Sequence, residues 1–213
     1  AARRLARPGA QSVGVVGAGR ISALTLHVLH SWLPSLASFR CFDLDAPRAH
    51  RFAEHMQTLG VAVDVTDCYE DAIAPADIAL AATTAQEAYV APECFREGSL
   101  FLNVSLMDPT FAFVQRADKI VVDDWAQCIH SDRVLARMHR EGLLSRAQVH
   151  AEFGEIIAGT LPGRERDDER IFFNPFGLAI EDLAVATALY RRATKLGIGQ
   201  SIDLVDEEWD VLF

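Results

Sequence analysis

An apolar stretch that runs directly into a glycine turn is the feature that most restricts the fold of this chain. Residues 13–19 read Val-Gly-Val-Val-Gly-Ala-Gly, and a second stretch, residues 39–43, ends on Asp43 about 24 residues after Gly19. A strand, a glycine turn, a helix and an acidic residue closing the next strand are typical of dinucleotide-binding domains. Gly17 permits the tight bend, Gly19 lets the backbone approach a pyrophosphate, and the following helix offers free N–H groups.

Asp43 is expected to select the ligand. Its carboxylate can accept hydrogen bonds from both hydroxyls of an adenosine ribose and would repel a 2′-phosphate, which favours NAD(H) over NADP(H). The alternative is that Asp43 or Asp45 only caps the next helix, and capping is the better interpretation for Asp45. Ser22 stands where the common pattern has a third glycine, a position where helix meets strand and a small side chain is tolerable.

Composition restricts the class of protein further. The chain has 213 residues, of which 50% are hydrophobic and 23% charged, a globular composition that is too apolar for a disordered chain. A net charge of −10 argues against a nucleic-acid partner, and no apolar stretch is long enough to span a bilayer. The four cysteines are scattered without a Cys-x-x-Cys pair, which predicts reduced, mostly packed thiols in a cytoplasmic protein.

Strand and helix signals alternate between Val13 and about Val122. Further short apolar stretches that fit buried parallel strands lie at residues 61–65, 78–83, 100–104 and 120–122. Strands that alternate with helices in this number predict an α/β fold with a Rossmann-like, doubly wound parallel sheet.

The pattern changes after this alternation. Residues 124–161 are predicted to be helical, residues 162–170 to form a solvated charged loop, and residues 171–177 to be extended up to a turn. Residues 178–196 are predicted to form a helix that ends at Gly197. Because this helix is apolar on more than one side, it should be buried between layers or domains.

Polar residues that follow the predicted strands are candidate site residues, because the carboxyl ends of parallel strands line the ligand crevice. Thr83 and Thr84 end one strand, although two threonines at a turn are an equally good interpretation. Asp108 follows the next strand and could face a nicotinamide and move protons in imine chemistry. From spacing alone, a turn or cap before Pro109 is the more common role for such a residue. His27 and His30 lack the partners of a metal site and are expected on an exposed helix face.

Several segments together resemble the ornithine cyclodeaminase/μ-crystallin family. They are residues 13–19, 76–84, 121–124, 151–164 and 177–186, and the last two are the most specific because a generic Rossmann domain does not need them. The resemblance covers nearly the whole chain. It implies tightly held NAD(H), and oxidation of an amino acid C–N bond to an imine or reduction of such an imine.

The resemblance also implies roles for individual residues. It assigns proton transfer to the carboxylate of Asp108, although Ser105-Leu106-Met107 stand where cyclodeaminases usually have small residues and glycines. The residues expected to contact the cofactor belong to the glycine turn and the strand ends: Gly17, Ala18, Gly19, Arg20, Ile21, Asp43, Thr83, Thr84, Val104 and Ser105.

One branch of the family is favoured by residues 103–106, 122–125 and 173–177. That branch comprises the N-(2-amino-2-carboxyethyl)-L-glutamate dehydrogenases, which release L-2,3-diaminopropionate and 2-oxoglutarate for siderophore or peptide antibiotic biosynthesis. The alternatives are an ornithine or lysine cyclodeaminase, a ketimine reductase, or a non-catalytic NAD(H)-binding protein.

Family chains carry an additional N-terminal domain that supplies most substrate-binding Lys and Arg residues and the dimer interface. We therefore assign residues 10–160 to the NAD(H)-binding domain and residues 161–213 to a segment that returns to the substrate and dimerisation domain. Residue 1 is expected to lie in the helix that leads out of the N-terminal domain. Residues 1–213 should bind NAD(H) without turning over an amino acid substrate alone, form a homodimer when that domain is present, and expose apolar surface on the helix at 178–196.

Overall fold

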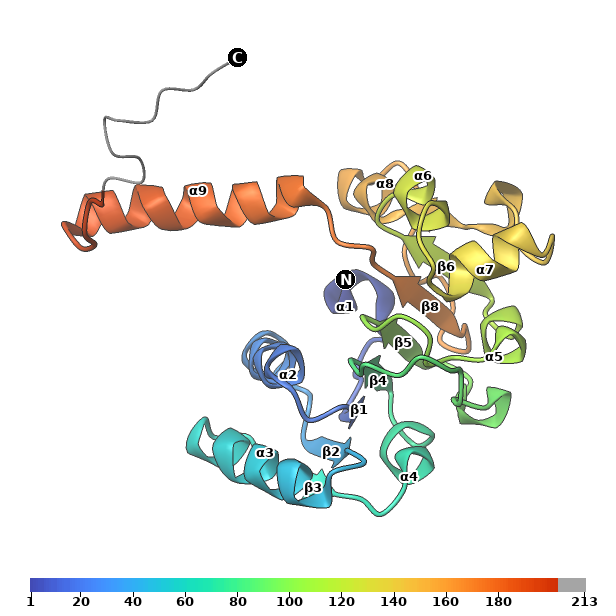
Figure 1. The fold of residues 1–213 in the computed structure, drawn as a ribbon, viewed down its shortest axis with the longest axis horizontal. Helices are drawn as coiled ribbons and strands as arrows, with labels where there is room; N and C mark the ends of the chain where they lie inside the picture. The colour runs from blue at the N-terminus through green and yellow to red at the C-terminus, as the bar shows by residue number, and fades with distance from the viewer. Residues whose placement is uncertain (203–213) are drawn as a thin grey trace, which may run out of the picture. The chain divides into compact units, whose positions relative to one another are not determined.

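The computed structural model describes residues 1–202, which divide into unit 1, residues 1–176, and unit 2, which begins at Gly177. Unit 1 contains one sheet of eight parallel strands in the order β3-β2-β1-β4-β5-β8-β6-β7 (Figure 1). The strands are β1 (Ser12–Val16), β2 (Ser38–Phe42), β3 (Asp64–Val65), β4 (Ile78–Ala81), β5 (Leu100–Asn103), β6 (Lys119–Val122), β7 (Ala151–Glu152) and β8 (Ile171–Asn174). The α/β prediction with a doubly wound parallel sheet is confirmed.

Helices cover both faces of this sheet. They are α1 (Ala2–Leu5), α2 (Arg20–Trp32), α3 (Ala46–Thr58), α4 (Tyr69–Ile73), α5 (Phe111–Gln115), α6 (Trp125–Ile129), α7 (Val134–Arg140) and α8 (Phe153–Ala158), with short 3₁₀ turns η1 (Pro92–Cys94) and η2 (Arg146–Gln148). One apolar core holds residues of α1, α2, α3 and α8, and the other holds residues of α4, α5, α6 and α7. Successive strand residues point alternately into the two cores, so the central strands are apolar at nearly every position.

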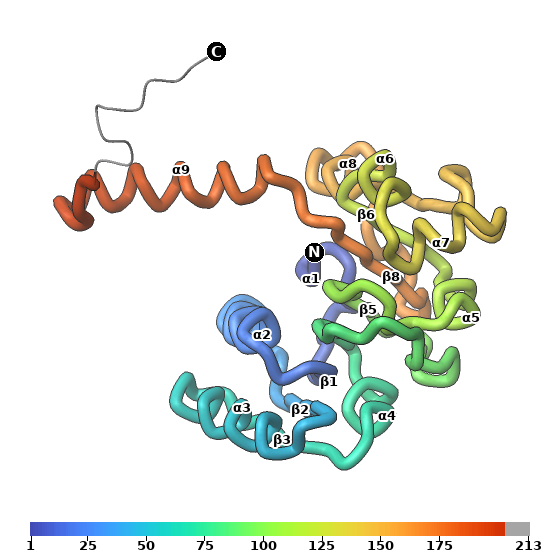
Figure 2. Tube along the Cα trace, in the orientation of Figure 1, coloured from blue at the N-terminus to red at the C-terminus, as the bar shows by residue number. Residues whose placement is uncertain are grey.

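The order in which the chain adds strands to the sheet reverses at β1. This strand pairs with β2 on one side and with β4 on the other, and the chain runs outward to β3 before it returns to β4 (Figure 2). Loops that leave β1 and β4 therefore diverge to opposite faces of the sheet. A crevice opens at the carboxyl ends of strands at such a switch point, which is where ligands bind in open α/β sheets.

The last strands of the sheet agree with the sequence prediction only in part. Residues 171–174, predicted to be extended, form β8 between β5 and β6, and residues 151–152 form β7 within a stretch predicted to be helical. Unit 1 consequently extends to Phe176, beyond residue 160, where we expected the sheet domain to end. The physical reason is that β8 pairs on both sides and completes the centre of the sheet.

The charged segment at 162–170 is a loop with mostly exposed residues, as predicted, but Glu169 is buried and ties the loop to the sheet. Lys119, at the start of β6, is buried and its Nζ lies 2.6 Å from Glu165 Oε2 and 3.1 Å from Glu169 Oε1. Glu169 is only 1% exposed. Burial alone raises the pKa of Glu169, but bonds from the Glu165 N–H and Lys119 outweigh it, so this pKa lies below its usual value.

Asp77 forms a second buried ion cluster, at the amino end of β4. Its Oδ1 pairs with the guanidinium groups of Arg7 and Arg96, and its Oδ2 accepts the N–H groups of Gln11 and Ser12 at 2.8 and 3.1 Å. Burial alone raises the pKa of Asp77. The bonds from Gln11, Arg96 and Ser12 and the charge of Arg7 more than offset this effect, so the pKa lies below its usual value.

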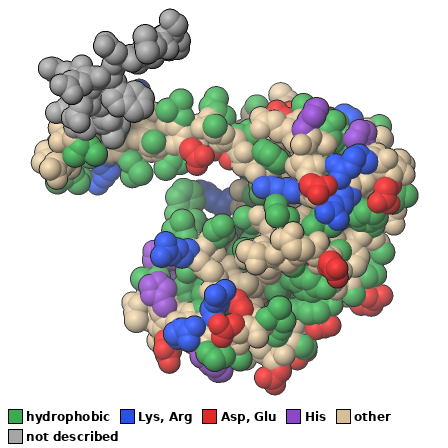
Figure 3. All heavy atoms as spheres, viewed as in Figure 1, with side chains coloured by type: hydrophobic (Ala, Val, Ile, Leu, Met, Phe, Trp, Pro, Cys, Tyr) green, Lys and Arg blue, Asp and Glu red, His purple; other side chains and the backbone are tan. Residues whose placement is uncertain are grey.

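Unit 2 contains α9 (Ala179–Leu196), which ends at Gly197 as predicted. No residue of α9 is buried, so the prediction of a helix enclosed between layers is not met by the described part of the chain. The predicted apolar surface is confirmed, because six large apolar side chains of α9 are between 55% and 73% exposed (Figure 3): Ile180, Leu183, Val185, Leu189, Tyr190 and Leu196. Among residues 1–202, no helix combines the length and apolarity that a membrane span requires.

Candidate functional site

The glycine turn joins β1 to α2. Gly17 has φ +97°, and a Cβ there would lie 2.5 Å from the Ala82 carbonyl oxygen, so both conformation and space require glycine. Gly19 precedes α2 with an extended backbone, and a Cβ built on it would meet no atom within 4 Å. The space beside Gly19 is therefore open for a ligand at the amino end of α2.

Ser22 occupies the third position of the glycine pattern. Its side chain is fully buried, and its Oγ donates to the Gly17 carbonyl. The Ser22 side chain, which lies in the first turn of α2, therefore stabilises the glycine turn.

Asp43 joins the end of β2 to this turn. Its Oδ2 accepts the Ala18 N–H at 2.7 Å, and its Oδ1 accepts the Asp45 N–H at 2.9 Å. Asp45 caps α3 by accepting the Arg48 N–H at 3.0 Å, which confirms its predicted capping role. Asp43 thus lies beside the glycine turn. It also accepts a hydrogen bond from the N–H group of Asp45, the residue that caps α3.

A cavity of about 710 Å³ runs along the carboxyl ends of β2, β1 and β4. This volume lies within the range of about 300–1,000 Å³ usual for ligand pockets. The cavity is lined by Val16, Gly17, Ala18, Gly19, Phe42, Asp43, Leu44, Arg48, Tyr69, Ala82, Thr83, Thr84, Ala85 and Tyr89. The structure therefore brings six of the expected residues together: Gly17, Ala18, Gly19, Asp43, Thr83 and Thr84.

Four expected cofactor contacts do not line this cavity. Arg20 and Ile21 lie in the first turn of α2, where their side chains are exposed. Val104 packs against the core, and Ser105 is buried with its Oγ donating to Asn103 Oδ1 at 3.2 Å. Proximity in sequence to a glycine turn or a strand end therefore did not ensure that a side chain faces the cavity.

Asp108 lies behind the cavity wall. It is fully buried, its Oδ1 accepts hydrogen bonds from Thr83 Oγ1 at 2.6 Å and Tyr89 Oη at 2.8 Å, and its Oδ2 has no hydrogen-bond partner among residues 1–202. Thr83 and Tyr89 both line the cavity, whereas Asp108 does not. The carboxyl group expected to face a ligand is thus connected to the cavity through two hydroxyl groups.

Two tyrosines in this wall were missed from the sequence. Tyr69 and Tyr89 meet edge to face with ring centroids 5.0 Å apart, and Tyr69 Oη donates to the Tyr89 carbonyl at 3.0 Å. Burial and a hydrogen bond with Glu70 raise the pKa of Tyr69 to about 12. Burial and the neighbouring Asp108 carboxylate raise the pKa of Tyr89 as well. Both phenols therefore remain protonated donors near neutral pH.

A buried amide pair fixes the strand ends beside Asp108. Asn103 Nδ2, at the end of β5, donates to Asn174 Oδ1, at the end of β8, at 2.6 Å. Both side chains are fully buried. This bond holds the carboxyl ends of two neighbouring central strands in register.

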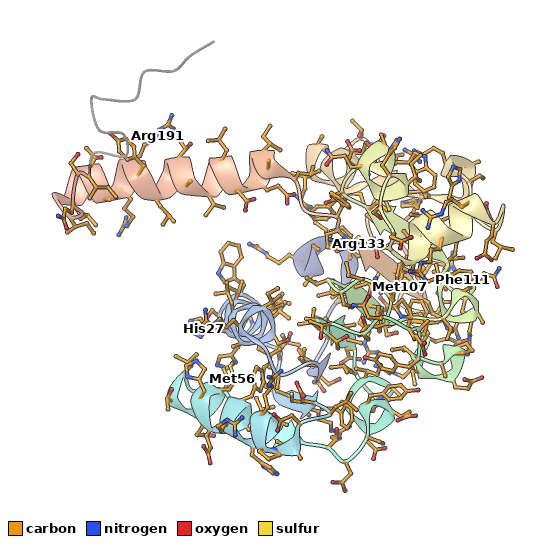
Figure 4. The ribbon with its side chains drawn as sticks, in the orientation of Figure 1. His27, Met56, Met107, Phe111, Arg133 and Arg191 are labelled. Carbon is orange, nitrogen blue, oxygen red and sulfur yellow. The ribbon has the colours of Figure 1, made fainter. Side chains whose placement is uncertain are left out.

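Arg133 is a cation near this edge that the sequence did not reveal. Its Nη1 donates to the Pro175 carbonyl at 2.9 Å, and its guanidinium lies over the ring of Phe176 at 4.7 Å. Figure 4 labels Arg133 and also His27, whose side chain points away from the sheet. Within residues 1–202, no group of three or more His, Cys, Asp and Glu side chains could hold a metal ion.

The fold and the cavity together define a class of protein. A doubly wound parallel sheet with a glycine turn at its switch point and an acidic residue after its second strand is a Rossmann-like dinucleotide-binding domain. The model of the ornithine cyclodeaminase/mu-crystallin family matches residues 1–196, and the chain belongs to this family. The resemblance stated from the sequence is confirmed.

Three relatives illustrate the similarity. N-((2S)-2-amino-2-carboxyethyl)-L-glutamate dehydrogenase of Staphylococcus aureus is 30% identical over 206 residues, which cover 96% of this chain and 61% of that protein. The Δ¹-pyrroline-2-carboxylate reductase of Thermococcus litoralis, solved with NADH and L-proline, has a TM-score of 0.85 and 29% identity over 95% of this chain and 64% of that chain. An archaeal alanine dehydrogenase dimer with bound NAD has a TM-score of 0.86 and 28% identity, with 96% and 64% of the two chains covered. The chain thus spans less than two thirds of the length of these relatives.

Proposed function

We propose that the cavity at the carboxyl ends of β2, β1 and β4 binds NAD(H). The observation that supports this proposal is the hydrogen bond from the Ala18 N–H to Asp43 Oδ2, because it holds beside the glycine turn a carboxylate that would accept the ribose hydroxyls. The open space beside Gly19 suits a pyrophosphate, and Thr83 and Thr84, which follow β4, line the same cavity and would contact the rest of the cofactor. Two of the relatives were solved with NADH or NAD bound.

We further infer that the whole protein is an NAD-dependent enzyme acting on an amino acid C–N bond. When bound, the cofactor accepts or supplies the hydride. Similarity to the S. aureus dehydrogenase favours oxidation of N-(2-amino-2-carboxyethyl)-L-glutamate, with release of L-2,3-diaminopropionate and 2-oxoglutarate. Reduction of a cyclic imine is the second candidate, because the pyrroline-2-carboxylate reductase is almost equally similar. Dimer formation is proposed from the archaeal dimer and the exposed apolar side chains of α9.

Cofactor choice tests the first proposal. Calorimetric titration of the 213-residue chain should show NADH binding at least tenfold tighter than NADPH. Asp43→Asn should weaken NADH binding about tenfold to a hundredfold, because a hydrogen bond to a charged group contributes about 1.5–3 kcal/mol. The matched control is Asp45→Asn, which alters the cap of α3 but should leave NADH affinity unchanged. Equal affinity for the two cofactors, or an Asp43→Asn chain that binds NADH normally, would contradict the proposal.

Substrate choice tests the second proposal. The full-length protein should form NADH and 2-oxoglutarate when it is given NAD⁺ and N-(2-amino-2-carboxyethyl)-L-glutamate. Parallel assays use ornithine or lysine with NAD⁺, and Δ¹-pyrroline-2-carboxylate with NADH. Proline and ammonia from ornithine without net NADH would identify a cyclodeaminase instead, and NADH consumption with the pyrroline would identify a reductase.

A further inference from the structure

The enclosed carboxyl group of Asp108 has a defined connection to the ligand cavity. Both of its hydrogen-bond donors, Thr83 Oγ1 and Tyr89 Oη, belong to residues that line the cavity, and both bond to the same oxygen, Oδ1. Since Asp108 is fully buried, a ligand in the cavity meets these residues first. The two hydroxyl groups therefore form the connection between the cavity and Asp108 that the structure describes.

Thr83 is the better placed of the two hydroxyls to receive a proton. Its Oγ1 donates its hydrogen to Asp108 and accepts the Ala85 N–H at 3.1 Å. A hydroxyl oxygen has two lone pairs, so one remains for a donor in the cavity. Tyr89 remains a protonated donor to Asp108, because burial and the nearby carboxylate raise its pKa.

We propose that Thr83 exchanges a proton with the nitrogen of the substrate, and that Asp108 and Tyr89 are positioning residues behind it. This inference rests on the proposed function, because it requires an amine or imine nitrogen beside the end of β4. In this proposal Thr83 touches the ligand, and Asp108 acts through Thr83 without touching the ligand. Hydrogen bonds that join Thr83 and Tyr89, from the segment after β4, to Asp108, from the segment after β5, set the path.

The proton transfer balances without a further reactant. A proton leaves the substrate nitrogen for Thr83 Oγ1 while the hydroxyl proton of Thr83 passes to Asp108 Oδ1. The N–H bond breaks, one O–H bond forms on the carboxyl group, and the threonine hydroxyl is regenerated. No electron is transferred in this step. For imine reduction, the same path runs in reverse.

Few charged groups lie around Asp108. Within residues 1–202, no Lys, Arg or His side chain pairs with it, and Oδ2 has no partner. The titratable groups that face it are the phenol of Tyr89 and, behind that, Tyr69 of α4 with its neighbour Glu70. The two hydroxyl groups are therefore the described polar groups that hold the carboxyl group of Asp108 in place.

Turnover of the full-length protein tests the path. Thr83→Val keeps the shape of the side chain but removes the hydroxyl, and should lower kcat at least tenfold at saturating NAD⁺, where a change in cofactor affinity does not affect the rate. Thr83→Ser keeps the hydroxyl and should restore most of kcat. Tyr89→Phe removes the other hydrogen bond to Asp108 Oδ1 and should lower kcat less than Thr83→Val does. Native kcat in Thr83→Val would overturn the proposal.

Infrared spectroscopy of the ligand-free chain gives a readout that does not depend on turnover. The carboxyl band of Asp108, identified by its loss in Asp108→Asn, should change frequency in Tyr89→Phe and in Thr83→Val, because each substitution removes one hydrogen bond to Oδ1. The matched control is Tyr190→Phe, an exposed tyrosine of α9, which should not move the band. An unmoved band in Tyr89→Phe would overturn the positioning role, while native NADH affinity in that variant would leave the proposed cofactor site intact.

Discussion

Replacing Gly17 with alanine should destabilise unit 1 by about 3 kcal/mol and abolish NADH binding, because backbone strain and overpacking each cost about 1–3 kcal/mol. The added Cβ would lie 2.5 Å from the Ala82 oxygen and 2.9 Å from its carbonyl carbon, and both atoms belong to the rigid backbone. Gly19→Ala should behave differently. Its backbone is extended and its Cβ meets open space, so stability should be native while NADH affinity falls at least tenfold.

Urea unfolding followed by circular dichroism, together with NADH calorimetry, separates these effects. Gly154→Ala is the matched control, because a Cβ there also meets no atom and Gly154 lies outside the cavity. It should leave both stability and affinity close to native. If Gly19→Ala bound NADH as tightly as the native chain, the pyrophosphate would not lie on this turn.

Asp77→Ala should lower the free energy of unfolding by about 2–3 kcal/mol, because a hydrogen bond to a charged group contributes about 1.5–3 kcal/mol and the two paired arginines remain partly exposed. The substitution leaves two guanidinium groups and the N–H groups of Gln11 and Ser12 without their acceptor. The native contribution depends on pH. Because the folded pKa is lowered, Asp77 stabilises the fold above the ordinary pKa of 3.8, and this stabilisation disappears as the pH falls through the folded value.

Urea unfolding at pH 7 and at pH 3 measures both effects. The difference between native and Asp77→Ala chains should be large at pH 7 and smaller at pH 3. Asp132→Ala is the control, since its carboxylate also meets two arginines but is 79% exposed, and it should not change stability measurably. An equally large loss in both variants would show that burial does not set the strength of the Asp77 cluster.

Local patterns predicted the parts of the site that depend on short stretches of chain. The turn at Gly17, the carboxylate of Asp43 and the threonines after β4 all lie beside the cavity, because each follows directly from a strand end. Long-range pairing could not be predicted in this way. Nothing in residues 171–174 indicates which strands they join, and nothing in residue 169 indicates that its carboxylate meets a buried lysine from β6.

Long-range packing also explains why Asp108 does not line the cavity, although the sequence predicted that it would face a ligand. A position after β5 predicts the correct edge of the sheet, but whether a side chain reaches the cavity depends on what packs over it. Here Thr83 and Tyr89, from the segment after β4, cover the carboxyl group. Tyr69 and Tyr89 lie in or near irregular segments without periodicity, so no pattern assigned them to the wall.

The central position of β8 also has a consequence for how the chain folds. The strands β5 and β6 become neighbours only through β8, which comes after both of them in the sequence. Until residues 171–174 have emerged from the ribosome, a nascent chain presents two facing strands with unpaired backbone groups, a template for association with other chains. A chain shortened at residue 160 would keep the glycine turn and yet retain those two open edges permanently, so we expect it to aggregate.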